Sequence, residues 1–165
     1  MKSILSTLII CILFSLSACG SSELLYQGIK HPKTSNVTIT FQEQNIPDSC
    51  VVFAHLIMNT KANSLGRDIA DALRAEAMEK GANTVLVGLA REDDGAELDN
   101  NRFDYYGPEY SYNFNRTWLG WKFGFDAWNE GGKLIGFGAN ASASREMTFT
   151  NSMMIQVVFL RCDGQ

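Results

Sequence analysis

The sequence predicts an α+β domain in which one main α-helix packs on a mixed β-sheet. Two observations predict this class. An apolar pattern of helical period within residues 64–80 runs directly into a β-branched segment, and apolar or alternating segments of strand length stand on both sides of it. The predicted order is strand, strand, helix, strand, inserted aromatic hairpin, strand, strand, in a single domain over residues 37–165.

The two segments before the helix are predicted to be strands. Residues 37–42 (VTITFQ) alternate apolar and polar side chains, as a strand with one buried face does. Residues 50–58 (CVVFAHLIM) are apolar almost without interruption, which indicates a strand that is buried on both faces.

The helix has the clearest pattern in the chain. Leu65, Ile69, Leu73 and Ala77 recur every four residues and form one apolar stripe, with charged residues on the other side. Gly81 follows at the position where a helix commonly ends in the left-handed conformation. The β-branched segment NTVLVGLA comes next, so the chain is expected to return from the helix directly into a strand.

The pattern weakens after that strand. Residues 91–104 contain six acidic residues and no apolar period, which predicts a solvated loop, with a divalent-cation loop as the alternative. The acidic residues lack the spacing that fixes calcium geometry, so no metal site is predicted. Residues 129–132 (NEGG) indicate a hairpin connection, and residues 133–144 alternate as a strand does. Residues 153–162 are long and apolar, and we expect a central or well-covered strand there.

Aromatic residues are concentrated in the predicted insertion, at about residues 91–132. Eleven of the eighteen Phe, Trp and Tyr residues lie between Phe103 and Trp128. Residues 110–115 and 121–128 alternate aromatic and polar side chains, which predicts two strands with one aromatic face each. The candidate binding surface consists of Tyr110, Tyr112, Phe114, Trp118, Trp121, Phe123, Phe125 and Trp128. The alternative is that these rings cover Gly136 and Gly138 of the next strand and extend the core.

The N-terminus resembles the signal peptide of a bacterial lipoprotein. Its apolar run, residues 4–16, is shorter than the roughly 20 residues that span a bilayer. The segment Leu16-Ser17-Ala18-Cys19 is similar to a lipobox, in which the cysteine is acylated and the peptide before it is removed. The resemblance implies that residues 1–18 are a signal peptide and that Cys19 carries a lipid anchor. An ordinary signal peptide that ends at a chance cysteine is the alternative.

The residues after Cys19 indicate where the protein is sorted. No Asp follows the cysteine, which by resemblance to enterobacterial sorting favours the outer membrane, with the domain facing the periplasm. Residues 19–36 lack periodicity and are predicted to be a short tether.

Charge and cysteine content exclude some functions. Removing residues 1–18 removes Lys2, so 13 Lys and Arg remain against 18 Asp and Glu, a net charge of −5 that argues against nucleic acid as the main partner. Cys50 and Cys162 are an even pair in an exported chain, which favours a disulfide over two free thiols. The only histidines are His31 and His55, and their spacing indicates no Cys–His dyad.

These features together resemble the RcsF and YbjQ-like group of small exported α/β lipoproteins. The resemblance is carried by the early Cys50, by GANTV at residues 81–85 after an Ala-rich helix, and by the closing residues Phe159–Cys162. It implies a compact mixed sheet with one main helix and a disulfide from the first core strand to the last. The aromatic segment lies outside the shared pattern, so envelope stress sensing is an analogy from fold only.

The sequence therefore favours an outer-membrane-anchored lipoprotein whose periplasmic domain is a non-enzymatic binding or envelope-sensing module for a protein or a glycan. No cofactor is predicted, and the oligomeric state stays open. One alternative is a cell-wall hydrolase that uses Glu109, Asp126 or Glu130, although no nucleophile or metalloprotease motif accompanies them. The other is a passive structural lipoprotein whose aromatic strands pair between copies.

Overall fold

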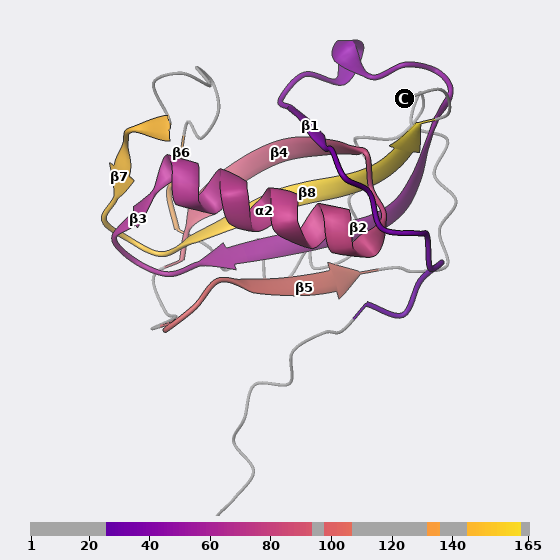
Figure 1. Cartoon of the computed structure of the whole chain (residues 1–165). Coiled ribbons are helices and arrows are strands. Elements are labelled where there is room, and N and C mark those ends of the chain that lie inside the picture. Colours follow the sequence, from indigo (N-terminus) through magenta and orange to yellow (C-terminus); the bar gives the residue numbers. More distant parts are fainter. Residues whose placement is uncertain (1–25, 94–97, 107–131, 136–144, 163–165) are drawn as a thin grey trace, which may run out of the picture.

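The structure is a computed structural model that describes residues 26–93, 98–106, 132–135 and 145–162. In these residues a mixed β-sheet carries one α-helix, α2 (Gly66–Lys80), across one face (Figure 1). The predicted α+β class and the single main helix are confirmed.

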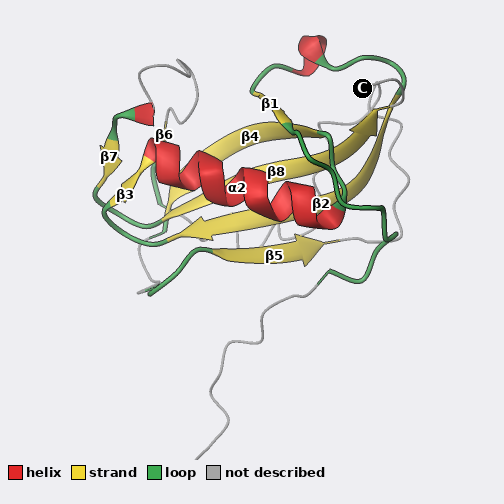
Figure 2. Cartoon of the chain, in the orientation of Figure 1, coloured by secondary structure: helices red, strands yellow, loops and turns green. Residues whose placement is uncertain are grey.

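The sheet has the strand order β1-β4-β8-β2-β5 (Figure 2). Its strands are β1 (Thr38–Thr40), β2 (Cys50–Thr60), β4 (Thr84–Glu92), β5 (Arg102–Tyr106) and β8 (Met153–Cys162). β1 runs parallel to β4, whereas β4, β8, β2 and β5 pair antiparallel to their neighbours. The predicted last strand, β8, is central, as expected from its continuous apolar sequence.

Three short strands and one turn of helix complete the described elements. β6 (Leu134–Ile135) pairs antiparallel with the end of β4. β3 (Ser64–Leu65) and β7 (Thr148–Phe149) form a separate two-stranded sheet at the start of α2, and η1 (Glu43–Asn45) is a 3-10 turn between β1 and β2.

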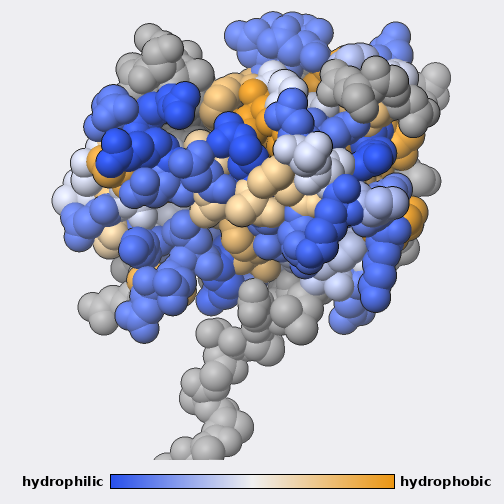
Figure 3. Space-filling model, in the orientation of Figure 1, coloured by the Kyte–Doolittle hydropathy of each residue, from blue (hydrophilic) through white to orange (hydrophobic). Residues whose placement is uncertain are grey.

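The core lies between α2 and the sheet. The apolar stripe of the helix is buried through Ile69, Leu73 and Ala77. These side chains pack in one cluster with alternate residues of the strands, such as Leu56 of β2 and Val157 of β8. The charged residues of α2 face outward, and the surface seen from the helix side is mostly hydrophilic (Figure 3).

α2 ends at Gly81, as predicted. Gly81 has a φ of 86°, and the amides of Gly81 and Ala82 donate to the carbonyls of Met78 and Ala77 at 3.1 and 2.9 Å. This is the Schellman arrangement, which favours glycine because L side chains rarely adopt a positive φ. A Cβ at Gly81 would also lie 2.5 Å from Cβ of His31, so the close approach of the N-terminal segment excludes a side chain there.

The N-terminal segment, residues 26–36, lies on the domain, although the sequence predicted a tether over residues 19–36. The ring centroids of Tyr26 and Tyr105 are 5.1 Å apart, and those of His31 and Phe53 are 4.6 Å apart. The amide of Thr34 donates to the carbonyl of Met78 at 3.1 Å. The described part of the predicted tether is therefore held against the end of α2.

The prediction of a solvated loop over residues 91–104 was wrong at both ends. β4 continues to Glu92, and β5 begins at Arg102 and pairs with β2. Phe103 and Tyr105 pack toward the core on the helix side. Their burial stabilises the strand although the residues next to them in sequence are polar. β5 is thus an edge strand of the main sheet rather than part of an insertion.

Candidate functional site

The sheet has a second face that points away from α2, and it carries the buried ionisable side chains of His55 and Asp104. We call it the second face. In β2, His55, Ile57 and Asn59 alternate with the core residues and lie opposite Tyr106, Asp104 and Arg102 of β5. On the other side of β2 they lie opposite Val158, Gln156 and Met154 of β8. Most of these side chains are buried, including His55, Asn59, Asp104 and Gln156.

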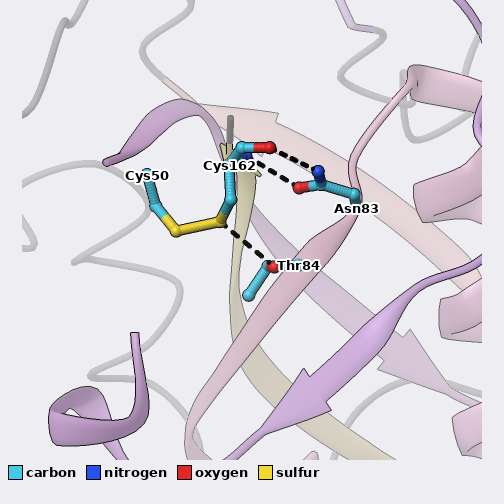
Figure 4. The surroundings of a disulfide bond; sticks show 4 residues. All are labelled: Cys50, Asn83, Thr84 and Cys162. Atoms are coloured by element: carbon cyan, nitrogen blue, oxygen red, sulfur yellow. Dashed lines mark hydrogen bonds between the residues drawn. A yellow bond between two sulfur atoms is a disulfide. The ribbon is translucent and has the colours of Figure 1, made fainter. Parts of the chain in front are cut away.

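One end of the second face is apolar and is closed by a disulfide between Cys50 and Cys162 (Figure 4). The two cysteines lie directly opposite each other at the ends of β2 and β8, with their Cα atoms 3.9 Å apart. The disulfide prediction is therefore confirmed. Because both sulfurs are bonded, neither cysteine is available as a catalytic nucleophile.

Asn83 fastens this end of the sheet to the loop after α2. Its side-chain Nδ2 donates to the carbonyl of Cys162 at 2.7 Å, and its Oδ1 accepts from the amide of Cys162 at 2.8 Å (Figure 4). The Thr84 hydroxyl lies 3.2 Å from Sγ of Cys162, and the hydroxyl is the donor because a disulfide sulfur carries no hydrogen.

The contacts of the Gly81-Ala82-Asn83 segment explain what each residue contributes to the fold. Gly81 ends α2, Ala82 is fully buried in the core cluster, and Asn83 holds the last strand. All three residues of this segment therefore have a structural role, and their contacts do not indicate a ligand-binding site.

The other end of the second face carries a buried carboxylate, Asp104. Its Oδ2 accepts hydrogen bonds from Asn59 Nδ2 at 2.6 Å and from Arg102 Nε at 3.0 Å. Nη2 of Arg102 lies 2.9 Å from the same oxygen, so the guanidinium and the carboxylate form an ion pair. Pairing with a cation and with an amide compensates the cost of removing the carboxylate from water.

A pocket of about 230 Å³ opens beside this carboxylate, and we call it the Asp104 pocket. It is lined by Ile57, Asn59, Asp93, Arg102, Asp104, Tyr106 and Met154. Its walls combine an aromatic ring and two apolar side chains with hydrogen-bond donors and acceptors. This combination, in a concave site, is typical of pockets that bind small polar molecules.

The protonation states in this region follow from burial. Burial lowers the pKa of His55 from 6.5 to about 4, so its imidazole is neutral at pH 7. Burial also raises the pKa of Tyr106, and the negative charge of Asp104 raises it further while Arg102 opposes this. The Tyr106 hydroxyl therefore keeps its proton and can both donate and accept a hydrogen bond.

A second pocket, of about 300 Å³, lies at the disulfide end of the sheet. It is lined by Lys33, Thr34, Ser35, Asn36, Thr38, Asn83 and Arg161. Its cations already have partners, because Lys33 Nζ lies 2.5 Å from Glu79 Oε2 and Arg161 Nη1 donates to the Gly81 carbonyl at 2.8 Å. These contacts stabilise the end of α2, where carbonyl groups are exposed, and they favour a structural role.

The residues that the sequence proposed for binding lie outside the described part of the chain. This holds for Cys19 and for the aromatic surface from Tyr110 to Trp128, and also for the acidic residues Glu109, Asp126 and Glu130. In the described ranges no helix has the length and apolar character needed to cross a membrane. Within the same ranges no group of three or more His, Cys, Asp and Glu side chains is arranged to hold a metal ion.

The Asp104 pocket was not predicted from the sequence. A signal was present in residues 102–106 (RFDYY), where Arg102, Asp104 and Tyr106 alternate with two aromatic core residues. Asn59 follows directly on the predicted strand of residues 50–58, which extends two residues further than expected.

Comparison with known proteins gives no relative from which a function could be transferred: no protein-family model, curated protein or solved structure matches this chain.

Proposed function

We propose that this protein is a lipoprotein of the bacterial outer membrane, anchored through acyl chains on Cys19, whose periplasmic domain binds an envelope partner without catalysing a reaction. The observation that carries the proposal is the segment Leu16-Ser17-Ala18-Cys19, which stands directly after an apolar run too short to span a bilayer. Several acyl chains hold a protein on a membrane far more firmly than one chain does.

Two features of the folded domain support this proposal. The disulfide between Cys50 and Cys162 suits an oxidising compartment such as the periplasm, where such bonds persist. The mature chain is acidic, which favours a protein or glycan partner over nucleic acid. The concentration of aromatic residues between Phe103 and Trp128 supplies a candidate surface for such a partner.

The anchor is tested by metabolic labelling with an alkyne-bearing palmitate in cells that express the full chain. We expect the label on the wild-type protein and its loss in Cys19→Ser. Cys11→Ser is the matched control, because it also removes a cysteine but from within the predicted signal peptide, and it should keep the label. Labelling that survives in Cys19→Ser contradicts the anchor, as does an unlabelled wild-type protein.

The sorting prediction is tested by separating the two membranes. By resemblance to enterobacterial sorting signals, wild-type protein is expected in the outer-membrane fraction and Gly20→Asp in the inner-membrane fraction. Wild-type protein in the inner membrane would reject the proposed location without affecting the anchor.

The binding role is tested by photo-crosslinking in intact cells. A photoreactive amino acid replaces Trp121, in the aromatic surface, or Asp71, an exposed residue of α2, as the control. We expect the Trp121 position to capture an envelope protein or peptidoglycan and the Asp71 position to capture neither. Equal capture at both positions, or none at either, counts against a binding surface in the aromatic segment.

A further inference from the structure

The polar side chains of the Asp104 pocket are held in place by hydrogen bonds to one another, and some of their donors and acceptors take no part in these bonds. Asp104 is the centre of the arrangement, because Asn59 and Arg102 both donate to its Oδ2. These bonds hold the amide of Asn59 and the guanidinium of Arg102 in defined orientations. Asn59 uses its Nδ2 group as the donor, which leaves its Oδ1 as an acceptor, and the guanidinium has further donors beside those directed at Asp104.

Tyr106 completes the set of polar groups at the pocket wall. Its hydroxyl forms no hydrogen bond with another residue of the described ranges, whereas the hydroxyl of its neighbour Tyr105 donates to Glu76 Oε1 at 2.6 Å on the opposite face. Tyr106 is half-buried and stays protonated, because both burial and Asp104 raise its pKa. The pocket therefore offers the Tyr106 side chain, whose hydroxyl can donate and accept a hydrogen bond and whose ring supplies aromatic surface.

The size and charge of the pocket narrow the class of ligand. Pockets that hold drug-sized molecules are commonly about 300–1,000 Å³. The Asp104 pocket, at about 230 Å³, is below that range and fits one ring. Arg102 and Asp104 form an ion pair that neutralises these two charges, and Asp93 adds a further carboxylate to the pocket wall, which disfavours an anion as the main ligand.

We propose that the Asp104 pocket binds one neutral sugar ring of a glycan. A sugar ring carries neighbouring hydroxyls, each of which donates and accepts. The amide of Asn59, the guanidinium of Arg102 and the phenol of Tyr106 supply the complementary groups. The C–H face of the ring packs on apolar surface, which Ile57, Met154 and the Tyr106 ring provide. This inference rests on the proposed binding function and names its ligand class.

The test uses the full mature lipoprotein in detergent micelles and saturation-transfer NMR. One probe is chitotetraose, a soluble chain of the N-acetylglucosamine rings found in the cell wall, and the other is maltotetraose, a chain of glucose rings. We expect transfer to at least one probe, and which of them responds identifies the glycan source. Because the ligand is neutral, the signal should not change when the salt concentration is raised.

Two variants on the second face and one control assign the binding to the pocket. Tyr106→Phe removes one hydroxyl and is expected to weaken the affinity about fivefold, the effect of one hydrogen bond. Arg102→Lys keeps a cation beside Asp104 but loses the planar fork, and we expect about a tenfold loss. Tyr105→Phe removes a hydroxyl from the same strand on the helix side and should bind as the wild type does.

The outcomes separate this inference from the proposed function. Absence of transfer to both sugars, or equal affinities in Tyr106→Phe, Arg102→Lys and Tyr105→Phe, overturns the sugar pocket. If capture from the Trp121 position succeeds in cells while the sugars fail, the protein is still a binding lipoprotein and only the sugar assignment is lost. Binding that disappears with rising salt indicates an ionic ligand and also overturns the inference.

Discussion

The two faces of the sheet are both buried, but they are built from different chemistry. The helix side packs a continuous apolar cluster between α2 and the strands. The second face is apolar throughout only near the disulfide, and toward its other end it buries His55, Asn59, Asp104 and Gln156 beside Ile57 and Met154. Burial of such groups costs free energy unless hydrogen bonds and ion pairs compensate it. The helix side is therefore expected to supply stability that depends little on pH, and the second face to carry the sensitivity to pH and ligands.

The largest expected effect comes from removing the disulfide at the apolar end of the second face. The bond joins cysteines 112 residues apart, and in the chain-entropy model a loop of this length contributes about 5 kcal/mol. The double variant Cys50→Ala, Cys162→Ala should lose about this much free energy of unfolding, measured by urea denaturation. Wild-type protein with reductant is the control and should lose a similar amount. A double variant as stable as the oxidised wild type would contradict this role for the bond.

On the helix side, Leu73→Ala is expected to cost about 3 kcal/mol. Leu73 is almost fully buried in the core cluster, and replacing it leaves a cavity under α2. No titratable group is created or removed, so urea denaturation should give the same loss at pH 7 and pH 5. A loss that changed strongly between these pH values would show that the helix side is coupled to the ionisable groups of the second face.

The second face should instead respond to pH through His55. The pKa of His55 is about 4 in the folded protein and 6.5 when exposed, so the unfolded chain takes up the proton first as the pH falls. This contribution to stability is complete above pH 6.5 and is lost progressively toward pH 4. At pH 5 the loss is roughly 2 kcal/mol.

The measurement compares urea denaturation at pH 7 and pH 5 for the wild type and for His55→Gln. Carboxylates titrate in both proteins, so their effect cancels in the comparison and the wild type should show the steeper decline. Leu73→Ala is the control and should decline as steeply as the wild type. Parallel declines in the wild type and His55→Gln would mean that the buried imidazole does not make the second face sensitive to pH.

The elements that were predicted from the sequence are those in which one pattern extends over many residues. The helix stripe of Ile69, Leu73 and Ala77 and the long apolar strands β2 and β8 are of this kind. β5 was missed because it has only five residues and follows an acidic segment. β3 and β7 have two residues each, which is too short for any period to be detected.

The Asp104 pocket could not be predicted for a different reason. Asn59 and Asp104 are 45 residues apart, and only the pairing of β2 with β5 brings them into hydrogen-bond distance. The alternation of Arg102, Asp104 and Tyr106 in the sequence indicates a strand with one polar face, but it does not indicate that Asn59 lies beside that face. The disulfide was easier to predict, because the predicted signal peptide and lipid anchor account for Cys11 and Cys19, and the two cysteines that are left allow one intramolecular pair.

The smallest expected effect is a difference in stability between two variants of β5, Tyr105→Phe on the helix side and Tyr106→Phe on the second face. The Tyr105 hydroxyl donates to Glu76, which also pairs with Lys80, so Tyr105→Phe should lose about 1 kcal/mol of stability. Tyr106→Phe removes a hydroxyl that has no such partner among the described residues, and its stability should stay within about 0.5 kcal/mol of the wild type.

Thermal or urea denaturation of the two variants, side by side, measures this difference. Because both substitutions remove one oxygen atom from neighbouring positions, differences in side-chain volume and strand propensity cancel. A larger loss in Tyr106→Phe would mean that this hydroxyl supports the fold, and weaker sugar binding by that variant could then no longer be assigned to a lost contact with the ligand. The expected order, stability through Tyr105 and binding through Tyr106, requires the two faces of β5 to serve different purposes.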